Sequence, residues 1–233
     1  MLTLLVTGFG PFPGAPSNPS SAIVDALGGA PSRRLARLGV RLVVAKLPVV
    51  FSEIPGALSA LLRETRPDAV LHIGLAGRRK KLGVELQARN RLTILYPDAA
   101  RALPASRHVV AQAPEFRRAR LPLAQIAHAL NAAGARAEIS RDAGSYVCNQ
   151  TLYLTLYESI AVAGFIHIPR PRGRKPLARV KTSRMPVQEM TGAIEQALTV
   201  IARAARQTSM RSSVRGGAHA ARRDGDRDAI EAA

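Results

Sequence analysis

Short apolar runs alternate with segments of helical periodicity along most of this chain. Residues 2–7, 69–75 and 164–168 form nearly continuous apolar runs, which is typical of parallel strands buried on both faces. Residues 52–65 carry apolar side chains at positions 54, 58, 61 and 62, the spacing of one face of a helix. The pattern therefore predicts strands that alternate with helices.

The same two periods predict the remaining elements. Leu82, Val84 and Leu86 alternate with other residues, which predicts a short antiparallel excursion around residues 82–96. We expect an α/β fold with a single domain, in which helices sandwich an open, mostly parallel twisted sheet in three layers. Further strands are expected at 41–45 and 137–140, and further helices at 21–27, 123–133, 147–159 and 187–205.

The final segment differs in composition from the rest. Residues 1–205 suffice for one α/β domain. Residues 206–233 mix Ser, Gly and charged residues without apolar periodicity, so the sequence predicts a disordered basic tail.

The charge of the chain raises the possibility of an anionic partner. The formal net charge is +18, and the last 30 residues, with six Arg and four acids, contribute only +2 of it. The basic runs at 78–81, 117–118 and 170–175 lack the interleaved aromatic residues that stack on exposed bases. We therefore expect a solvated basic surface rather than a nucleic-acid site.

Several classes of protein are disfavoured. One cysteine among 233 residues excludes an intramolecular disulfide and a cysteine-only metal cluster. The start lacks the basic segment of a signal peptide, and no apolar stretch reaches the roughly 20 residues of a membrane span. The loop that starts at Gly8 resembles the dinucleotide-binding motif Gly-x-Gly-x-x-Gly, but the motif is incomplete because Pro13 replaces its last glycine. No metal-binding motif occurs in the sequence. We expect a cytoplasmic protein without membrane contact, metal or cofactor.

Candidate chemistry lies in the loops where strands end. Cys148 follows a glycine turn at the start of a predicted helix, where free amides and the helix dipole favour a thiolate. His167 ends a predicted strand and is a candidate base for that thiol. Glu85 is an acid in a basic region, and Asp142 is a rival acid, although its position before Ala-Gly favours turn capping. Each residue also has a purely structural interpretation, since lone cysteines are often small buried hydrophobes.

Five motifs, which follow one another along the chain, carry a resemblance to a known family. They are Thr-Gly-Phe-Gly-Pro-Phe at 7–12, Leu-Pro-Val-Val-Phe at 47–51, His-Ile-Gly-Leu-Ala-Gly at 72–77, Asp-Ala-Gly-Ser-Tyr-Val-Cys-Asn at 142–149 and Gly-Phe-Ile-His-Ile-Pro at 164–169. Together they resemble the pyroglutamyl peptidase I family, cysteine peptidases that remove an amino-terminal pyroglutamyl residue. The match extends from Leu2 to about Ile201.

The resemblance implies roles for three residues. It implies Cys148 as nucleophile, His167 as base and Glu85 as the acid that orients the base. The reaction would pass through a thioester acyl-enzyme without a cofactor. The family also implies peptide substrates with amino-terminal pyroglutamate, and a homo-oligomer, either dimer or tetramer.

The resemblance also implies a lactam pocket, lined by Phe9, Phe12 and Tyr146. Aromatic ring faces suit a flat, uncharged ring, because they stack on its amide and cover its methylenes.

The chain departs from the family pattern near these motifs. Leu86 stands where the acid is normally followed by Arg, residues 97–100 lack the usual Asn and Gly, and Arg170-Pro171-Arg172 replaces a more neutral sequence. Two alternatives stay open: a related cysteine amidohydrolase with another cyclic or γ-amide substrate, and a non-catalytic basic binding protein on the same scaffold.

Overall fold

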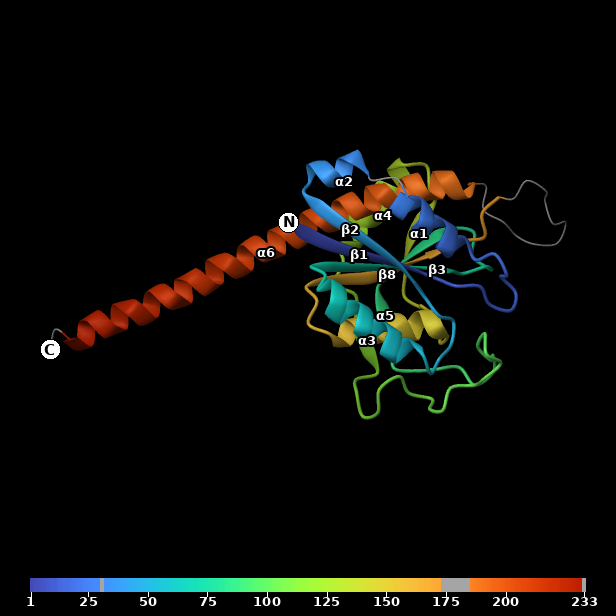
Figure 1. Ribbon diagram of the computed structural model, residues 1–233, viewed down its shortest axis with the longest axis horizontal. Coiled ribbons are helices and arrows are strands. Elements are labelled where there is room, and N and C mark those ends of the chain that lie inside the picture. The colour runs from blue at the N-terminus through green and yellow to red at the C-terminus, as the bar shows by residue number, and fades with distance from the viewer. Residues whose placement is uncertain (30–31, 173–184, 232–233) are drawn as a thin grey trace.

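A six-stranded sheet forms the centre of the protein, in the order β2-β1-β3-β8-β4-β7 (Figure 1). The computed structural model describes residues 1–29, 32–172 and 185–231, with side chains up to residue 211. The strands of this sheet are β1 (Leu2–Phe9), β2 (Val40–Leu47), β3 (Ala69–Leu75), β4 (Leu82–Glu85), β7 (Ala137–Ser140) and β8 (Val162–Ile168). The helices are α1 (Pro19–Gly29), α2 (Arg33–Arg37), α3 (Ile54–Thr65), α4 (Leu123–Ala132), α5 (Val147–Tyr157) and α6 (Val187–Glu231).

The sheet is parallel except at one junction. Strands β2, β1, β3 and β8 run in the same direction. Strand β4 pairs antiparallel with β8, with Gly83 opposite His167, and runs parallel to β7. The mostly parallel α/β fold expected from the sequence is therefore confirmed.

Helices cover both faces of the sheet and make three layers. Helices α1, α2, α4 and α6 lie on one face, and α3 and α5 lie on the other (Figure 1). Strands β1, β3 and β8 are apolar on both sides because each side meets a helical layer. The face covered by α3 and α5 has a core that includes Ile54, Val70, Leu152, Tyr153 and Phe165.

The antiparallel excursion is present and is split between two sheets. Strand β4 belongs to the central sheet, and β5 (Gln87–Arg89) pairs antiparallel with β6 (Phe116–Arg118) in a separate two-stranded sheet. The partner of β5 therefore lies beyond the 82–96 region that the alternation marked.

The last helix differs from its expected length. Helix α6 continues to Glu231 (Figure 1), whereas the sequence predicted a disordered tail from residue 206. No proline follows Pro186, so no residue after it interrupts backbone hydrogen bonding. Arg206 donates to the carbonyl of Leu38, so α6 still contacts the domain just beyond the predicted boundary.

A buried histidine joins β1, β3 and α5. The ring of His72 is fully buried, and its Nδ1 and Nε2 lie 2.6 and 2.7 Å from the hydroxyls of Thr7 and Thr155. Burial lowers the His72 pKa to about 3. The ring is therefore neutral in the folded protein near pH 7 and serves as a structural link.

This histidine predicts an acid-sensitive fold. The unfolded chain binds a proton at His72 near pH 6.5, whereas the folded chain does so only near pH 3. Its stabilising contribution is complete above pH 6.5 and is lost as pH falls, with a limiting slope of about 1.4 kcal/mol per pH unit. Urea unfolding between pH 7.5 and 4.5 should show this slope reduced in His72→Gln. The exposed His128→Gln is the control, and equal slopes in all three proteins would contradict the assignment.

Candidate active site

The candidate residues meet at one edge of the sheet, on the face covered by α3 and α5. Strands β1, β3 and β8 end at this edge because they are parallel. Cys148 lies in the first turn of α5, which packs on the same face. Loops after parallel strands of an open sheet commonly form functional sites in this position.

The turn before α5 places Cys148 at the helix start. Gly144 adopts a left-handed conformation with φ of +81°, and its amide donates to Asp142 Oδ1 at 3.0 Å. Asp142 thus caps this turn, as its sequence context favoured. Tyr146 is the extended N-cap residue and makes no side-chain capping bond. The first amides of α5 therefore lack a side-chain cap and are suited to hold an oxyanion.

Glu85 and His167 form a buried pair across β4 and β8. Since Gly83 is opposite His167, Glu85 is its diagonal neighbour on the same face. His167 Nδ1 donates to Glu85 Oε1 at 2.7 Å, and the side chains are 6% and 0% exposed. This bond leaves Nε2 as the proton-accepting nitrogen of the neutral ring.

Gly74 brings the thiol close to this pair. In β3 it is the register partner of His167. A Cβ atom placed on Gly74 would lie 2.9 Å from Cys148 Sγ and 2.6 Å from Phe165 Cζ. The Phe165 and His167 rings are in turn 4.5 Å apart between centroids. The absent side chain at residue 74 is what lets the sulfur approach the strand that carries His167.

The Glu85 carboxyl is ionised although it is buried. Burial by itself raises its pKa, but the hydrogen bond and charge of His167, with Ser140 and Arg79, outweigh this effect and lower the pKa below its ordinary value. Arg79 Nη1 donates to the same oxygen, Oε1, at 2.8 Å. Glu85 is therefore an anion held between two donors.

The thiol of Cys148 is less acidic than the helix start suggested. Burial, followed by the nearby Glu85 charge, raises the Cys148 pKa to about 12. A backbone hydrogen bond and the charge of Arg79 lower it, but by less. The expected stable thiolate is therefore absent from the resting site, and the neutral thiol needs a base.

The three expected pocket residues lie together beside the thiol. Phe12 and Tyr146 have ring centroids 6.4 Å apart, and Phe51 meets the Tyr146 ring edge-on at 5.2 Å. Tyr146 Oη donates to the carbonyl of Pro97 at 3.0 Å, which fixes that ring. The pocket is lined by Phe9, Phe12, Asn18, Val49, Leu75, Tyr146, Val147 and Cys148.

Hydrogen bonds from other residues fix the pocket loops. Asn18 holds the first loop, since its Nδ2 donates to the Gly10 carbonyl at 2.9 Å and its Oδ1 accepts from the Ser20 amide at 3.1 Å. The buried Asp98 accepts from the Phe51 amide at 2.9 Å. The loop at 97–100, which departs from the family pattern, is therefore anchored to the pocket wall.

Asn149 ties the acid-bearing region to α5. Its side chain exchanges hydrogen bonds of 2.8 Å with the backbone of Arg89 and donates to the carbonyl of Arg91 at 2.9 Å. The sequence showed Asn149 directly after the cysteine, but its role depends on this long-range contact. Arg79 and Gly74 were also missed as site residues, because their contacts come from distant strands.

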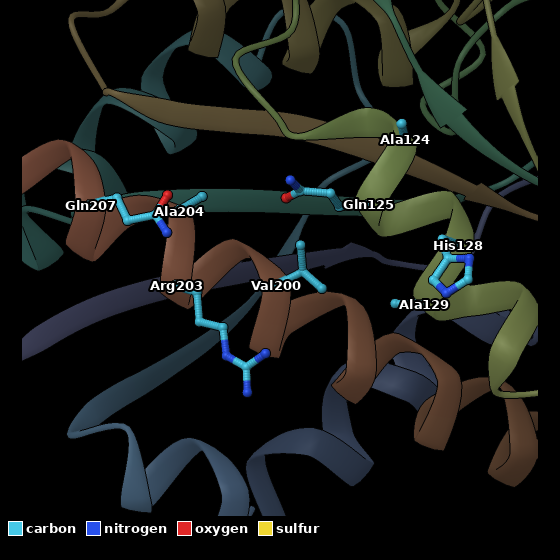
Figure 2. Close-up of a pocket in the computed structure, with 8 residues that line it drawn as sticks. All are labelled: Ala124, Gln125, His128, Ala129, Val200, Arg203, Ala204 and Gln207. Atoms are coloured by element: carbon cyan, nitrogen blue, oxygen red, sulfur yellow. The ribbon is translucent and has the colours of Figure 1, made fainter.

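A different hollow lies on the opposite face of the sheet, between α4 and α6 (Figure 2). Its lining is Ala124, Gln125, His128, Ala129, Val200, Arg203, Ala204 and Gln207. Of the candidate residues Glu85, Cys148 and His167, none lines this hollow. Of the three, Cys148 lines the pocket beside α5.

The described residues contain no group of three or more His, Cys, Asp or Glu side chains arranged to hold a metal. No helix in the described part of the chain has the length and apolar character required to cross a membrane. Of the basic run at 170–175, residues 173–175 lie outside the described residues, and Arg170 donates to the Gly14 carbonyl at 2.8 Å.

Comparisons with known proteins agree with the motifs. The sequence model of the pyroglutamyl peptidase family matches residues 2–204. The chain belongs to this family. Pyrrolidone-carboxylate peptidase 1 of Ralstonia nicotianae is 38% identical over 174 residues, covering 72% of this chain and 79% of that protein. The corresponding peptidase of Thermococcus onnurineus is 38% identical over 176 residues, covering 72% and 84%.

Solved structures of family members share the fold. Pyroglutamyl peptidase I of Bacillus amyloliquefaciens gives a TM-score of 0.78 at 27% identity, covering 87% of this chain and 98% of that chain. The Thermus thermophilus enzyme gives 0.75 at 36% identity, covering 84% and 99%. This chain is therefore a cysteine peptidase by family.

The close approach at Gly74 predicts an intolerant position. In Gly74→Ala the added methyl group would collide with Cys148 Sγ and Phe165, so activity on a pyroglutamyl amide should fall by about 100-fold or more. Gly56→Ala is the matched control, because Gly56 is exposed in α3 with open space around it. A Gly74→Ala enzyme as active as Gly56→Ala would contradict the geometry.

The raised thiol pKa predicts an unusual alkylation profile. The rate of iodoacetamide labelling of the sole cysteine should rise about tenfold per pH unit through pH 10, because the thiolate fraction rises this way below the pKa. The chain unfolded in urea should instead level off near pH 8.5. A plateau below pH 8 in the folded protein would reveal a preformed thiolate and contradict the pKa of about 12.

Proposed function

We propose that this protein removes the amino-terminal pyroglutamyl residue from peptides through a thioester acyl-enzyme on Cys148. The observation that carries the proposal is the buried Glu85–His167 pair, with Nδ1 to Oε1 at 2.7 Å, in which His167 is the register partner of Gly74, the position that Cys148 Sγ approaches. Family membership supports the same reaction.

The pocket supports selection of an uncharged ring. Among the described residues that line it, none is Asp, Glu, Lys, Arg or His, and the rings of Phe12 and Tyr146 are included. A lactam ring would pack against these aromatic faces, and burying a charged glutamate there would be unfavourable without a partner. The scissile carbonyl of the pyroglutamyl residue would lie toward Cys148, which lines the same pocket.

Acylation begins with a neutral thiol. His167 Nε2 removes the thiol proton as Sγ attacks the carbonyl carbon of the pyroglutamyl residue. Glu85 stabilises the imidazolium that forms, and the first amides of α5 hold the oxyanion. His167 then donates the proton to the leaving amine, and the C–N bond breaks. The shortened peptide leaves, and the pyroglutamyl group stays on Cys148 as a thioester.

Deacylation uses the same base. His167, neutral again, accepts a proton from a water molecule as the water oxygen attacks the thioester carbonyl. The C–S bond breaks, the proton passes to the sulfur, and pyroglutamate leaves. One water is consumed for each peptide cleaved, and no oxidant or cofactor is required.

Two further expectations accompany this function. A dimer or tetramer stays a prediction, and light scattering of the purified protein during gel filtration measures it directly. A cytoplasmic location likewise stays a prediction.

The central test uses fluorogenic amides. The wild type should hydrolyse a pyroglutamyl amide and spare the matched prolyl and glutamyl amides, which lack the lactam carbonyl or carry a charge. Cys148→Ala should lose turnover by at least about 10⁴-fold, because nucleophile and base act as one unit.

Other outcomes would redirect the assignment. Cys148→Ala with full turnover would refute the nucleophile. A folded, reduced wild type that spares the pyroglutamyl amide and cleaves another cyclic or γ-amide would indicate the related amidohydrolase. Salt-sensitive binding to mixed oligonucleotides without any hydrolysis would indicate the binding protein.

A further inference from the structure

Arg79 reaches from the loop after β3 into the candidate active site. Its Nη1 donates to Glu85 Oε1 at 2.8 Å. Its Nη2 donates to Ser140 Oγ at 3.1 Å and to the carbonyl of Asp142 at 2.6 Å. One guanidinium therefore connects the acid to the end of β7 and to the turn that leads to Cys148.

Gly83 makes room for this guanidinium. A Cβ atom on Gly83 would collide with Arg79 Nη1 and lie 3.3 Å from Ser140 Cβ. Gly83 is also the register partner of His167. The guanidinium thus crosses β4 directly beside the strand position of the base, where only glycine leaves enough space.

Neighbouring cations have other contacts. Lys81 pairs with Glu138 at 2.7 Å on the surface. Arg170 donates to the Gly14 carbonyl. Leu86, where the family pattern has arginine after the acid, is uncharged. Among the described residues, the ion pairs of Glu85 are those with Arg79 and His167.

The permanent charge of arginine matters because His167 changes its charge during the reaction. The proposed reaction requires a neutral His167 to accept the Cys148 proton, and in that form the ring offers Glu85 a hydrogen bond but no opposite charge. Arginine stays protonated at all relevant pH values. Arg79 therefore supplies a cation to the buried carboxylate at this stage, and its charge lowers the pKa of both Glu85 and Cys148.

We propose that Arg79 is a positioning residue: its guanidinium keeps Glu85 ionised and in place, so that Glu85 keeps His167 oriented with Nε2 ready to accept the Cys148 proton. Among the described residues, the groups facing Glu85 are Arg79 from the β3–β4 loop, His167 from β8, Ser140 from β7 and the Cys148 thiol from α5. For its turnover measurement, the proposal rests on the proposed function.

The test compares Arg79→Met, which removes the charge, with Arg79→Lys, which keeps it. Arg78→Met is the matched control, because Arg78 is the exposed neighbour in the same loop. The first measurement is kcat and KM for a pyroglutamyl amide from pH 5 to 9. The second is the iodoacetamide labelling rate of the sole cysteine, which requires no substrate.

Arg79→Met should lower kcat about 10- to 100-fold, with KM changed less than about threefold, because the base is misplaced rather than the substrate. The acidic limb of its pH–rate profile should move to higher pH, since Glu85 protonates more easily without the cation. Cysteine labelling at fixed pH should slow several-fold. Arg79→Lys should recover part of kcat and most of the labelling rate, and Arg78→Met should match the wild type.

Two results would overturn the proposal. One is Arg79→Met with kcat and labelling within twofold of the wild type. The other is a loss of kcat with an unchanged acidic limb, unchanged labelling and no recovery in Arg79→Lys, which indicates a merely structural role. If Arg79→Met does not fold, Arg79→Gln, which also removes the charge, is measured in its place and judged by the same two outcomes. If the wild type spares the reporter, the proposed function fails while the labelling comparison still tests Arg79.

Discussion

A carboxylate removed from water must either be paired or take up a proton, and this constraint acts on Glu85. Its side chain is fully buried at the end of β4, yet two donors meet at Oε1 and keep it charged. The partners come from the β3–β4 loop and from β8, so the antiparallel junction in the sheet serves to bring them together. The orientation of His167 depends on this carboxylate, and so does the proposed use of Cys148 as a nucleophile.

The net pKa shift of the Cys148 thiol is opposite to that of Glu85, because the groups around the thiol do not outweigh the effect of burial. Cys148 lies at the start of α5, where the helix dipole favours the anion, but desolvation and the Glu85 charge raise the thiol pKa to about 12. The site therefore resembles a general-base system more than a preformed ion pair. The glycines at 74 and 83 permit this compactness, since each leaves space that a side chain would take from Cys148 or Arg79.

The sequence predicted the strands best where apolar runs are closed by marked turns. Strands Ala69–Leu75 and Ala137–Ser140 have the bounds expected from their pattern. Helix α6 is longer than predicted. The residues after 205 have no apolar periodicity, so the sequence pattern gave no sign that the helix continues. The family resemblance implied Glu85, Cys148 and His167 as a set, but the register of β3, β4 and β8 was needed to show that they lie close together. Arg79 lies in a run of four basic residues at 78–81, and nothing in that run shows which side chain points into the site.

The thioester on Cys148 is the central claim, and intact mass spectrometry tests it most directly. The protein is mixed with an activated pyroglutamyl ester, quenched in acid within milliseconds to seconds, and digested to locate any adduct. The account predicts one pyroglutamyl group on the peptide that contains Cys148, appearing before the product is released and absent from Cys148→Ala. Turnover that continues after complete alkylation of Cys148, or an adduct on another residue, would contradict it.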